Sequence, residues 1–378
     1  MKRTLIALLL VCSALLLCGC GQLADLYDKE YLSVTDYEPP AAEKAVAEDS
    51  VTVHDMDELR GALTALIDAG APGGHVIFDT AYTGDINADI ASVCWQVRTQ
   101  DALYAYCVEN ISYELSKIVS HNEATISISY TEAGLERDQI VHLQFSTGLE
   151  EQLYAAIARG DSRLVVLIDR SRITAEDVDS LASRVYREDP VLAPKEPRVT
   201  VNMLSGTGMQ RLYEINFNYG MTEEEFLIRR SAIQELRPFA QTEDLPEAPA
   251  LRALRACELL AEGTRYSSAG PSDIYSALIL GEANSEGIAL AYVELCRQLS
   301  VPCQIVYGQR DWHSCCWNIV QIDGAYYHVD VTLCSLEGME SGFLQADETM
   351  WGRYRWDISS YPPCRGTLRY ADLFPEPL

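Results

Sequence analysis

The sequence lacks an apolar run long enough to cross a bilayer, which would take about 20 residues. The longest candidate lies between Leu5 and Leu17 and follows the basic residues Lys2 and Arg3. A short apolar core behind basic residues is typical of a secretory signal peptide. We therefore place a signal peptide at residues 1–19 and expect an exported protein.

The apolar run ends in Leu17-Cys18-Gly19-Cys20, which resembles the cleavage site of bacterial lipoproteins. The resemblance implies that Cys20 is acylated, becomes the new N-terminus and holds the protein on the outer face of the cell membrane, since each buried CH₂ of a lipid contributes ~0.8 kcal/mol. The alternatives are an ordinary signal peptide cut nearby or an uncleaved anchor. Residues 20–50 are polar and acidic, so we expect a lipid-anchored flexible tether.

Basic residues are also scarce. The chain has 29 Lys and Arg against 56 Asp and Glu, a net charge of −27. Such a field disfavours nucleic acid and anionic lipid, so we expect no nucleic-acid partner.

The cysteines lack the spacing of a metal site. Nine of them follow Cys20, and no two are arranged as Cys-x-x-Cys. A zinc site is therefore not expected, and we assign neither a metal nor any other cofactor. An odd number of cysteines leaves at least one thiol unpaired in an exported protein, and many of these cysteines fit helix or strand patterns as small buried apolar residues.

Two stretches, residues 51–135 and 136–222, follow the same predicted order of strand, helix, strand, helix and two further strands. The first helix of each has apolar residues at helical spacing, Leu59 and Leu63 in one and Leu149 and Leu153 in the other. We predict an internal repeat of two small α/β modules. Nothing in them indicates catalysis, and we interpret them as spacers or binding surfaces.

The C-terminal part begins after a polar helical linker, residues 223–246, and occupies residues 247–378. Ser285 is a candidate N-cap for a helix that ends near Leu299. A strand is predicted at residues 304–307. A hairpin is predicted at residues 317–331, because Asp323-Gly324 lies between two alternating segments.

Several short segments of this part resemble the bacterial transglutaminase-like family, which has a papain-like α+β fold. The matching segments are Ala277-Leu278, Glu286-Gly287, Val301-Pro302-Cys303, Trp317-Asn318, Ile322-Asp323-Gly324 and Tyr326 through Thr332. The resemblance covers about residues 250–378. It implies an α+β protein in which a transglutaminase-like domain follows the two α/β modules.

Active members of that family use a cysteine, a histidine and an aspartate. Matched by position, the nucleophile lies at Ser285, the base at Cys315 and the orienting acid at Asp330; we call these three positions the triad seats. Loss of a nucleophile or a base can cost on the order of 10⁶ in rate. The resemblance therefore implies a catalytically degenerate domain that binds peptide, protein or cell-wall polymer, or that serves as a scaffold.

An active enzyme is the competing hypothesis. His313 lies two residues before Cys315, so in a strand it points to the same face and could substitute as the base. The result would be a peptidase, amidase or acyl transferase that uses Ser285, His313 and Asp330, or a site based on Cys315. Against this, His313 is displaced by ~6–7 Å along the strand. His328 shares a face with Asp330 and is a further candidate.

Overall fold

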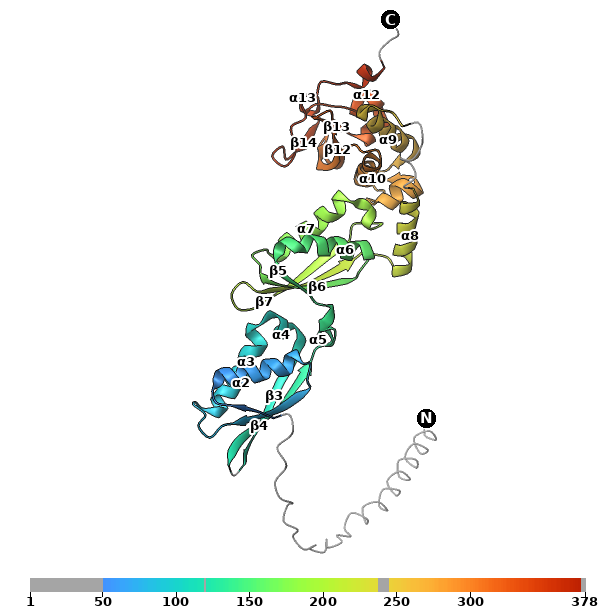
Figure 1. Cartoon of the computed structure of the whole chain (residues 1–378). Coiled ribbons are helices and arrows are strands. Elements are labelled where there is room, and N and C mark those ends of the chain that lie inside the picture. Colours follow the sequence, from blue (N-terminus) through green and yellow to red (C-terminus); the bar gives the residue numbers. More distant parts are fainter. Residues whose placement is uncertain (1–49, 119, 237–244, 375–378) are drawn as a thin grey trace, which may run out of the picture. The chain divides into compact units, whose positions relative to one another are not determined.

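The computed structural model describes residues 50–118, 120–236 and 245–374 (Figure 1). The predicted signal peptide, Cys20 and nearly all of the predicted tether lie outside these residues. None of the helices in the described ranges is both long and apolar enough to cross a membrane. Residues 51–378 form one compact unit, and the finer domain boundaries given above stay predictions.

The first module contains a four-stranded sheet with the strand order β1-β2-β4-β3. Its helices start where the sequence supplies a cap: the carboxylates of Asp55 and Asp85 accept hydrogen bonds from the first free backbone N–H groups of α2 and α3. Leu59 and Leu63 of α2 are fully buried. The elements are β1 (Ser50–Val53), α2 (Met56–Asp68), β2 (Gly73–Phe78), α3 (Ile86–Gln100), α4 (Ala102–Cys107), β3 (Val108–Ile118) and β4 (His121–Tyr130).

The second module has the strand order β5-β6-β8-β7, which is the same order counted along the chain. Helices α6 and α7 cover one face of its sheet (Figure 1), and α7 begins with a capping box formed by Thr174 and Asp177. The elements are α5 (Glu132–Leu135), β5 (Val141–Phe145), α6 (Leu149–Arg159), β6 (Arg163–Arg170), α7 (Ala175–Glu188), β7 (Arg198–Ser205) and β8 (Arg211–Asn218). The expected order of elements is present in both modules, while their origin as a sequence repeat stays a prediction.

The C-terminal domain packs helices against an antiparallel sheet with the order β13-β12-β11-β14. The predicted turn at Asp323 and Gly324 joins β12 to β13, and both residues have positive φ, +50° and +83°, as a type I′ turn requires. Helix α8 (Glu223–Glu235) lies in the predicted linker. The elements of the domain are α9 (Pro249–Gly263), β9 (Arg265–Tyr266), β10 (Glu282–Ala283), α10 (Ser285–Gln298), β11 (Cys303–Arg310), β12 (His313–Ile322), β13 (Ala325–Val329), α11 (Val331–Glu337), α12 (Met339–Gly342), α13 (Asp347–Met350) and β14 (Tyr354–Trp356).

Helix α10 is the centre of this domain. Its apolar residues Ile288, Tyr292 and Leu295 are buried, and the Tyr292 hydroxyl donates a hydrogen bond to the Ala253 carbonyl of α9 (3.0 Å). Residues of the second module, such as Tyr186, belong to the same buried apolar cluster as this stripe.

The N-cap of α10 differs from the prediction. Asn284, not Ser285, is the cap: its side-chain oxygen accepts hydrogen bonds from the N–H groups of Glu286 and Gly287 (3.0 and 3.1 Å). Ser285 is the first helical residue. Its hydroxyl is therefore free to interact with the neighbouring strand instead of the helix end.

Candidate active site

Ser285 lies where α10 meets β12. Its side chain is nearly buried, with 8% of the residue exposed, and its hydroxyl oxygen accepts a hydrogen bond from the backbone N–H of Cys316 (3.1 Å). Gly287 lets the backbone carbonyl of Asp273 lie close to the start of α10, because a Cβ at position 287 would be only 3.0 Å from that oxygen. The first two triad seats are thus on adjacent elements, with Cys315 next to the residue that contacts Ser285.

Asp330 is buried, with 1% exposed, and all of its interactions are made with groups other than an imidazole. Its carboxylate accepts hydrogen bonds from the Leu333 N–H (2.9 Å), the Tyr354 hydroxyl (2.7 Å) and an Nη atom of Arg310 (2.5 Å). Although burial opposes the charge of Arg310, the carboxylate raises the pKa of that guanidinium above its ordinary value. The carboxylate that would orient a catalytic histidine is therefore held in an ion pair.

Cys315 is a protonated thiol at neutral pH. Burial raises its pKa to about 11, and the negative charge of Asp330 adds to the shift. A protonated thiol is not a nucleophilic thiolate, and it cannot accept a proton from a hydroxyl. A general base works best with a pKa near the operating pH. Cys315, at the predicted base position, therefore does not act as a base.

Neither candidate histidine is placed as a substitute base. His313 is exposed, and its Nδ1 is 2.9 Å from the carbonyl oxygen of Asp311. Among the described residues it makes no hydrogen bond to Ser285 or Asp330. This geometry gives the rearranged triad no support.

His328 is fully buried and has a different role. Its Nδ1 accepts a hydrogen bond from the indole N–H of Trp317 (3.0 Å), so the ring proton is on Nε2, which donates to Asp347 (2.9 Å). Burial lowers the pKa of His328, with Asp347 opposing the shift. The ring is therefore neutral and already paired at both nitrogens, and it is not recruited to Asp330.

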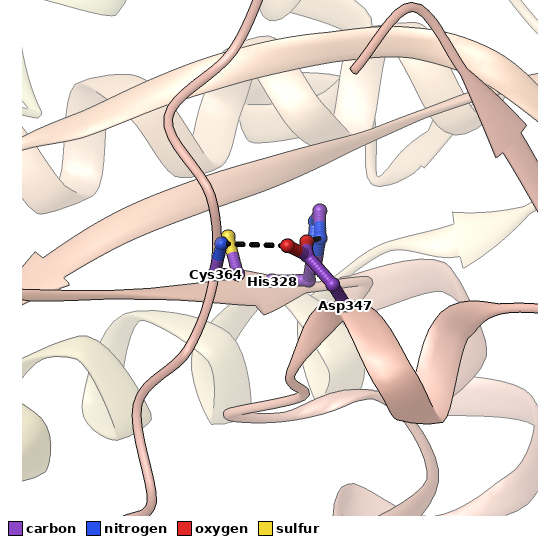
Figure 2. A group of neighbouring side chains, drawn as sticks. All are labelled: His328, Asp347 and Cys364. Carbon is purple, nitrogen blue, oxygen red and sulfur yellow. Dashed lines mark hydrogen bonds and ion pairs between the residues drawn. The ribbon is translucent and has the colours of Figure 1, made fainter.

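His328, Asp347 and Cys364 form the one group in the described ranges whose ligand atoms, all within 4.8 Å of one another, could hold a metal ion (Figure 2). Figure 2 shows Asp347 between the ring of His328 and the backbone N–H of Cys364, which donates to its second oxygen (3.1 Å). A cation bound at Nε2 would require that nitrogen to lose its proton. Because Trp317 donates a hydrogen bond to Nδ1, the ring would then carry no proton on either nitrogen and would be an imidazolate anion. Burial, with Asp347 adding to the shift, also raises the pKa of the Cys364 thiol to about 12. We interpret the group as a structural hydrogen-bond chain.

Sequence reasoning missed Arg310 and Tyr354, the two side chains that hold Asp330. Neither residue belongs to the segments that resemble the family, and only the tertiary structure brings them to Asp330.

Sequence reasoning also missed Arg187 of α7, whose guanidinium carbon is 4.3 Å from the ring centroid of Tyr307. Arg187 and Tyr307 lie near Glu286, whose pKa is raised by burial.

The comparisons with known proteins agree with the predicted family. Residues 239–331 match the transglutaminase-like superfamily, which confirms a transglutaminase-like domain and the α+β class. A solved structure described as a TGase is 12% identical over 53% of this chain and 57% of its own, with a TM-score of 0.26. The periplasmic domain of TgpA from Pseudomonas aeruginosa is 13% identical over 37% of this chain and 61% of its own, with a TM-score of 0.24. This chain thus spans less than two thirds of either structure, and no curated protein matches it.

Proposed function

We propose that the transglutaminase-like domain of this chain binds its ligand without transforming it. The observation that carries the proposal is the ion pair between Arg310 and Asp330 (2.5 Å). An orienting carboxylate acts by hydrogen-bonding an imidazole and stabilising its charged form. Here the carboxylate of Asp330 interacts with the guanidinium of Arg310, and the base seat, Cys315, is a protonated thiol.

The remaining seat supports the same conclusion. A serine hydroxyl is a weak nucleophile unless an adjacent base accepts its proton. The hydroxyl of Ser285 instead accepts a hydrogen bond from the Cys316 N–H, and no imidazole contacts it within the described residues. Ser285 and Asp330 are therefore engaged by groups other than a catalytic base, and Cys315 is a protonated thiol.

The proposed biological setting is an exported lipoprotein anchored through Cys20. Its ligand would be a peptide, a protein or a cell-wall polymer, which the domain holds near the cell surface. The short basic and apolar N-terminus, ending in the Leu17–Cys20 motif, supports this setting.

Turnover by the full chain tests the catalytic part. We expect no release of ammonia from a glutaminyl peptide with an amine acceptor, and no hydrolysis of peptide substrates, above the background of the Ser285→Ala variant. Ser276→Ala is the matched control, because Ser276 is another buried serine of this domain. Activity that is lost in Ser285→Ala and kept in Ser276→Ala, or an acyl adduct trapped on Ser285, would refute the proposal.

Fatty-acid labelling of cells that express the chain tests the anchor. Label and membrane retention should be lost in Cys20→Ala and kept in Cys18→Ala, which removes a cysteine two residues away. Equal labelling of both variants would contradict anchoring through Cys20.

A further inference from the structure

The hairpin tip between β11 and β12 exposes a tryptophan in an unfavourable backbone conformation. Asp311 and Trp312 have φ values of +50° and +71°, a region that a bulky side chain rarely adopts. Trp312 is nevertheless 73% exposed. Strained residues of this kind persist only where the surrounding structure holds them, and they cluster at functional sites.

The surrounding contacts keep this tip rigid. The Asp311 N–H donates a hydrogen bond to the Arg353 carbonyl (2.8 Å), and the Arg353 side chain bridges the carboxylates of Asp311 (3.0 Å) and Glu337 (3.2 Å). An exposed aromatic ring on a rigid support loses little conformational freedom on binding, which favours its use as a binding anchor.

Arg355 covers one face of this ring. Its guanidinium carbon is 3.3 Å from the centroid of Trp312, and Arg355 is itself exposed. Across the described residues no acidic side chain is within ion-pair distance of Arg355. In a chain with 56 acidic and 29 basic residues, a cation that is stacked on an exposed tryptophan and not paired with a carboxylate is available to an acidic group from outside.

The surface around Arg355 also carries exposed apolar side chains. Strand β14, which carries Arg355, is an edge strand of the sheet, but its Tyr354 already forms a β-bridge with Trp351. The contacts to a ligand must therefore come from side chains. Large apolar side chains flank the same region: Trp351 is 64% exposed and Ile358 is 71% exposed.

We infer that Trp312 and Arg355 form a docking site for a peptide that carries a carboxylate, because a cation without an acidic partner among the described residues, beside exposed apolar side chains, suits a ligand with both acidic and apolar side chains. The carboxylate pairs with the planar fork of Arg355, a geometry that suits bidentate hydrogen bonds. An apolar side chain of the peptide packs on the uncovered face of Trp312. Nucleic acid is disfavoured because the net charge of −27 opposes a polyanion far more strongly than a single carboxylate paired with Arg355. Peptide is thus the ligand class of the domain, and this rests on the proposed function in one respect only, namely that the bound peptide is not cleaved.

Fluorescence anisotropy with the full chain tests this directly. The probes are fluorescein-labelled pentapeptides with capped ends that carry Phe and, two residues later, Glu, Gln or Lys. The Glu peptide should bind at least tenfold more tightly than the isosteric Gln peptide, and its advantage should fall between 50 and 500 mM salt because an exposed charge pair is screened. Equal affinity for the Glu and Gln peptides, or no measurable binding of any of them, overturns the inference.

Three variants place the site. Trp312→Ala should weaken binding of the Glu peptide at least tenfold, and Arg355→Gln should abolish the preference for Glu over Gln. Trp95→Ala is the matched control, because Trp95 is 60% exposed on α3 of the first module; it should bind as the unmodified chain does. Equal loss in Trp95→Ala, or tryptophan-dependent binding of a chito-oligosaccharide in place of the peptides, overturns the inference. Cleavage of a peptide that still docks through Arg355 would instead refute the proposed function and leave this site in place.

Discussion

Replacing Arg310 tests how strongly the buried ion pair holds Asp330. The side chain of Arg310 is 12% exposed and that of Asp330 is 1% exposed. Removing one partner of a buried ion pair costs about 3–5 kcal/mol, because the other charge is left uncompensated. Asp330 keeps its hydrogen bonds from Tyr354 and from the Leu333 N–H, so for Arg310→Gln we expect the lower end, about 3 kcal/mol.

A double-mutant cycle separates the pair from the loss of one side chain. Asp330→Asn keeps one oxygen, which can still accept the hydrogen bond from the Leu333 N–H and cap α11, and it replaces the oxygen shared by Arg310 and Tyr354 with an uncharged NH₂ group. In the background of Asp330→Asn, the cost of Arg310→Gln should fall by at least about 1 kcal/mol, since coupled charges in contact show interaction energies of about 0.5–3 kcal/mol.

Urea unfolding of the full chain, followed by tryptophan fluorescence, measures this cycle. Four of the five tryptophans, at positions 312, 317, 351 and 356, lie in the C-terminal domain, so the signal reports mainly on that domain. Arg265→Gln is the matched control, because Arg265 pairs with Glu282 on the surface, where 72% and 39% of the side chains are exposed; such pairs contribute about 0.2–1 kcal/mol. If Arg310→Gln costs no more than Arg265→Gln, or if the cycle shows no coupling, the reasoning is wrong.

Three further predictions follow from the same contacts. Ser285→Cys combined with Cys315→His should give a cysteine that iodoacetamide alkylates slowly at pH 7, and adding Arg310→Gln should speed alkylation at least tenfold, since Asp330 then becomes available to the new imidazole; full reactivity without the third change would contradict the role of Arg310. Trp317→Phe removes the donor to the buried Nδ1 of His328 and should destabilise the domain by about 1–3 kcal/mol, measured by urea unfolding; a change near zero would contradict the tautomer assigned here. The pKa of His328 is lowered in the folded state, so the unfolded state binds the extra proton and stability should decline as pH falls below about 6.5. In urea midpoints measured from pH 7.5 to 5, His328→Asn should flatten that decline. An unchanged pH dependence in His328→Asn would contradict the assignment of the decline to His328.

Two of the three seats, Ser285 and Asp330, also have a structural role. In an active triad the nucleophile, base and acid are tuned for proton transfer. Here Ser285 ties α10 to β12 through the Cys316 N–H, and Asp330 joins the start of α11 to β11 and β14 through its three partners. The same positions that would serve catalysis thus act as hydrogen-bonded links between elements, which gives a physical reason for keeping Asp330.

Local sequence signals predicted much of the fold. The Asp-Gly pair predicted the turn between β12 and β13, and the structure shows further local signals of this kind in the caps Asp55, Asp85 and Thr174. These signals work because each depends on interactions between residues only a few positions apart. The cap of α10 was misplaced by one residue, since Asn284 and Ser285 are both good N-cap residues, and only the contact of Ser285 with β12 distinguishes them.

The chain itself determined the order of its helices and strands, the resemblance of its C-terminal segments to a family, and the residue types in the three seats, because all of these are properties of neighbouring residues. The tertiary structure decided which side chains hold Asp330 and that His328 is paired with Trp317 and Asp347. Arg310 and Tyr354 are separated from Asp330 by 20 and 24 positions, and they reach it only because β11, β14 and the start of α11 are brought together by strand register and packing. Such a choice of partner depends on distances between segments that are remote along the chain, and no local pattern encodes those distances.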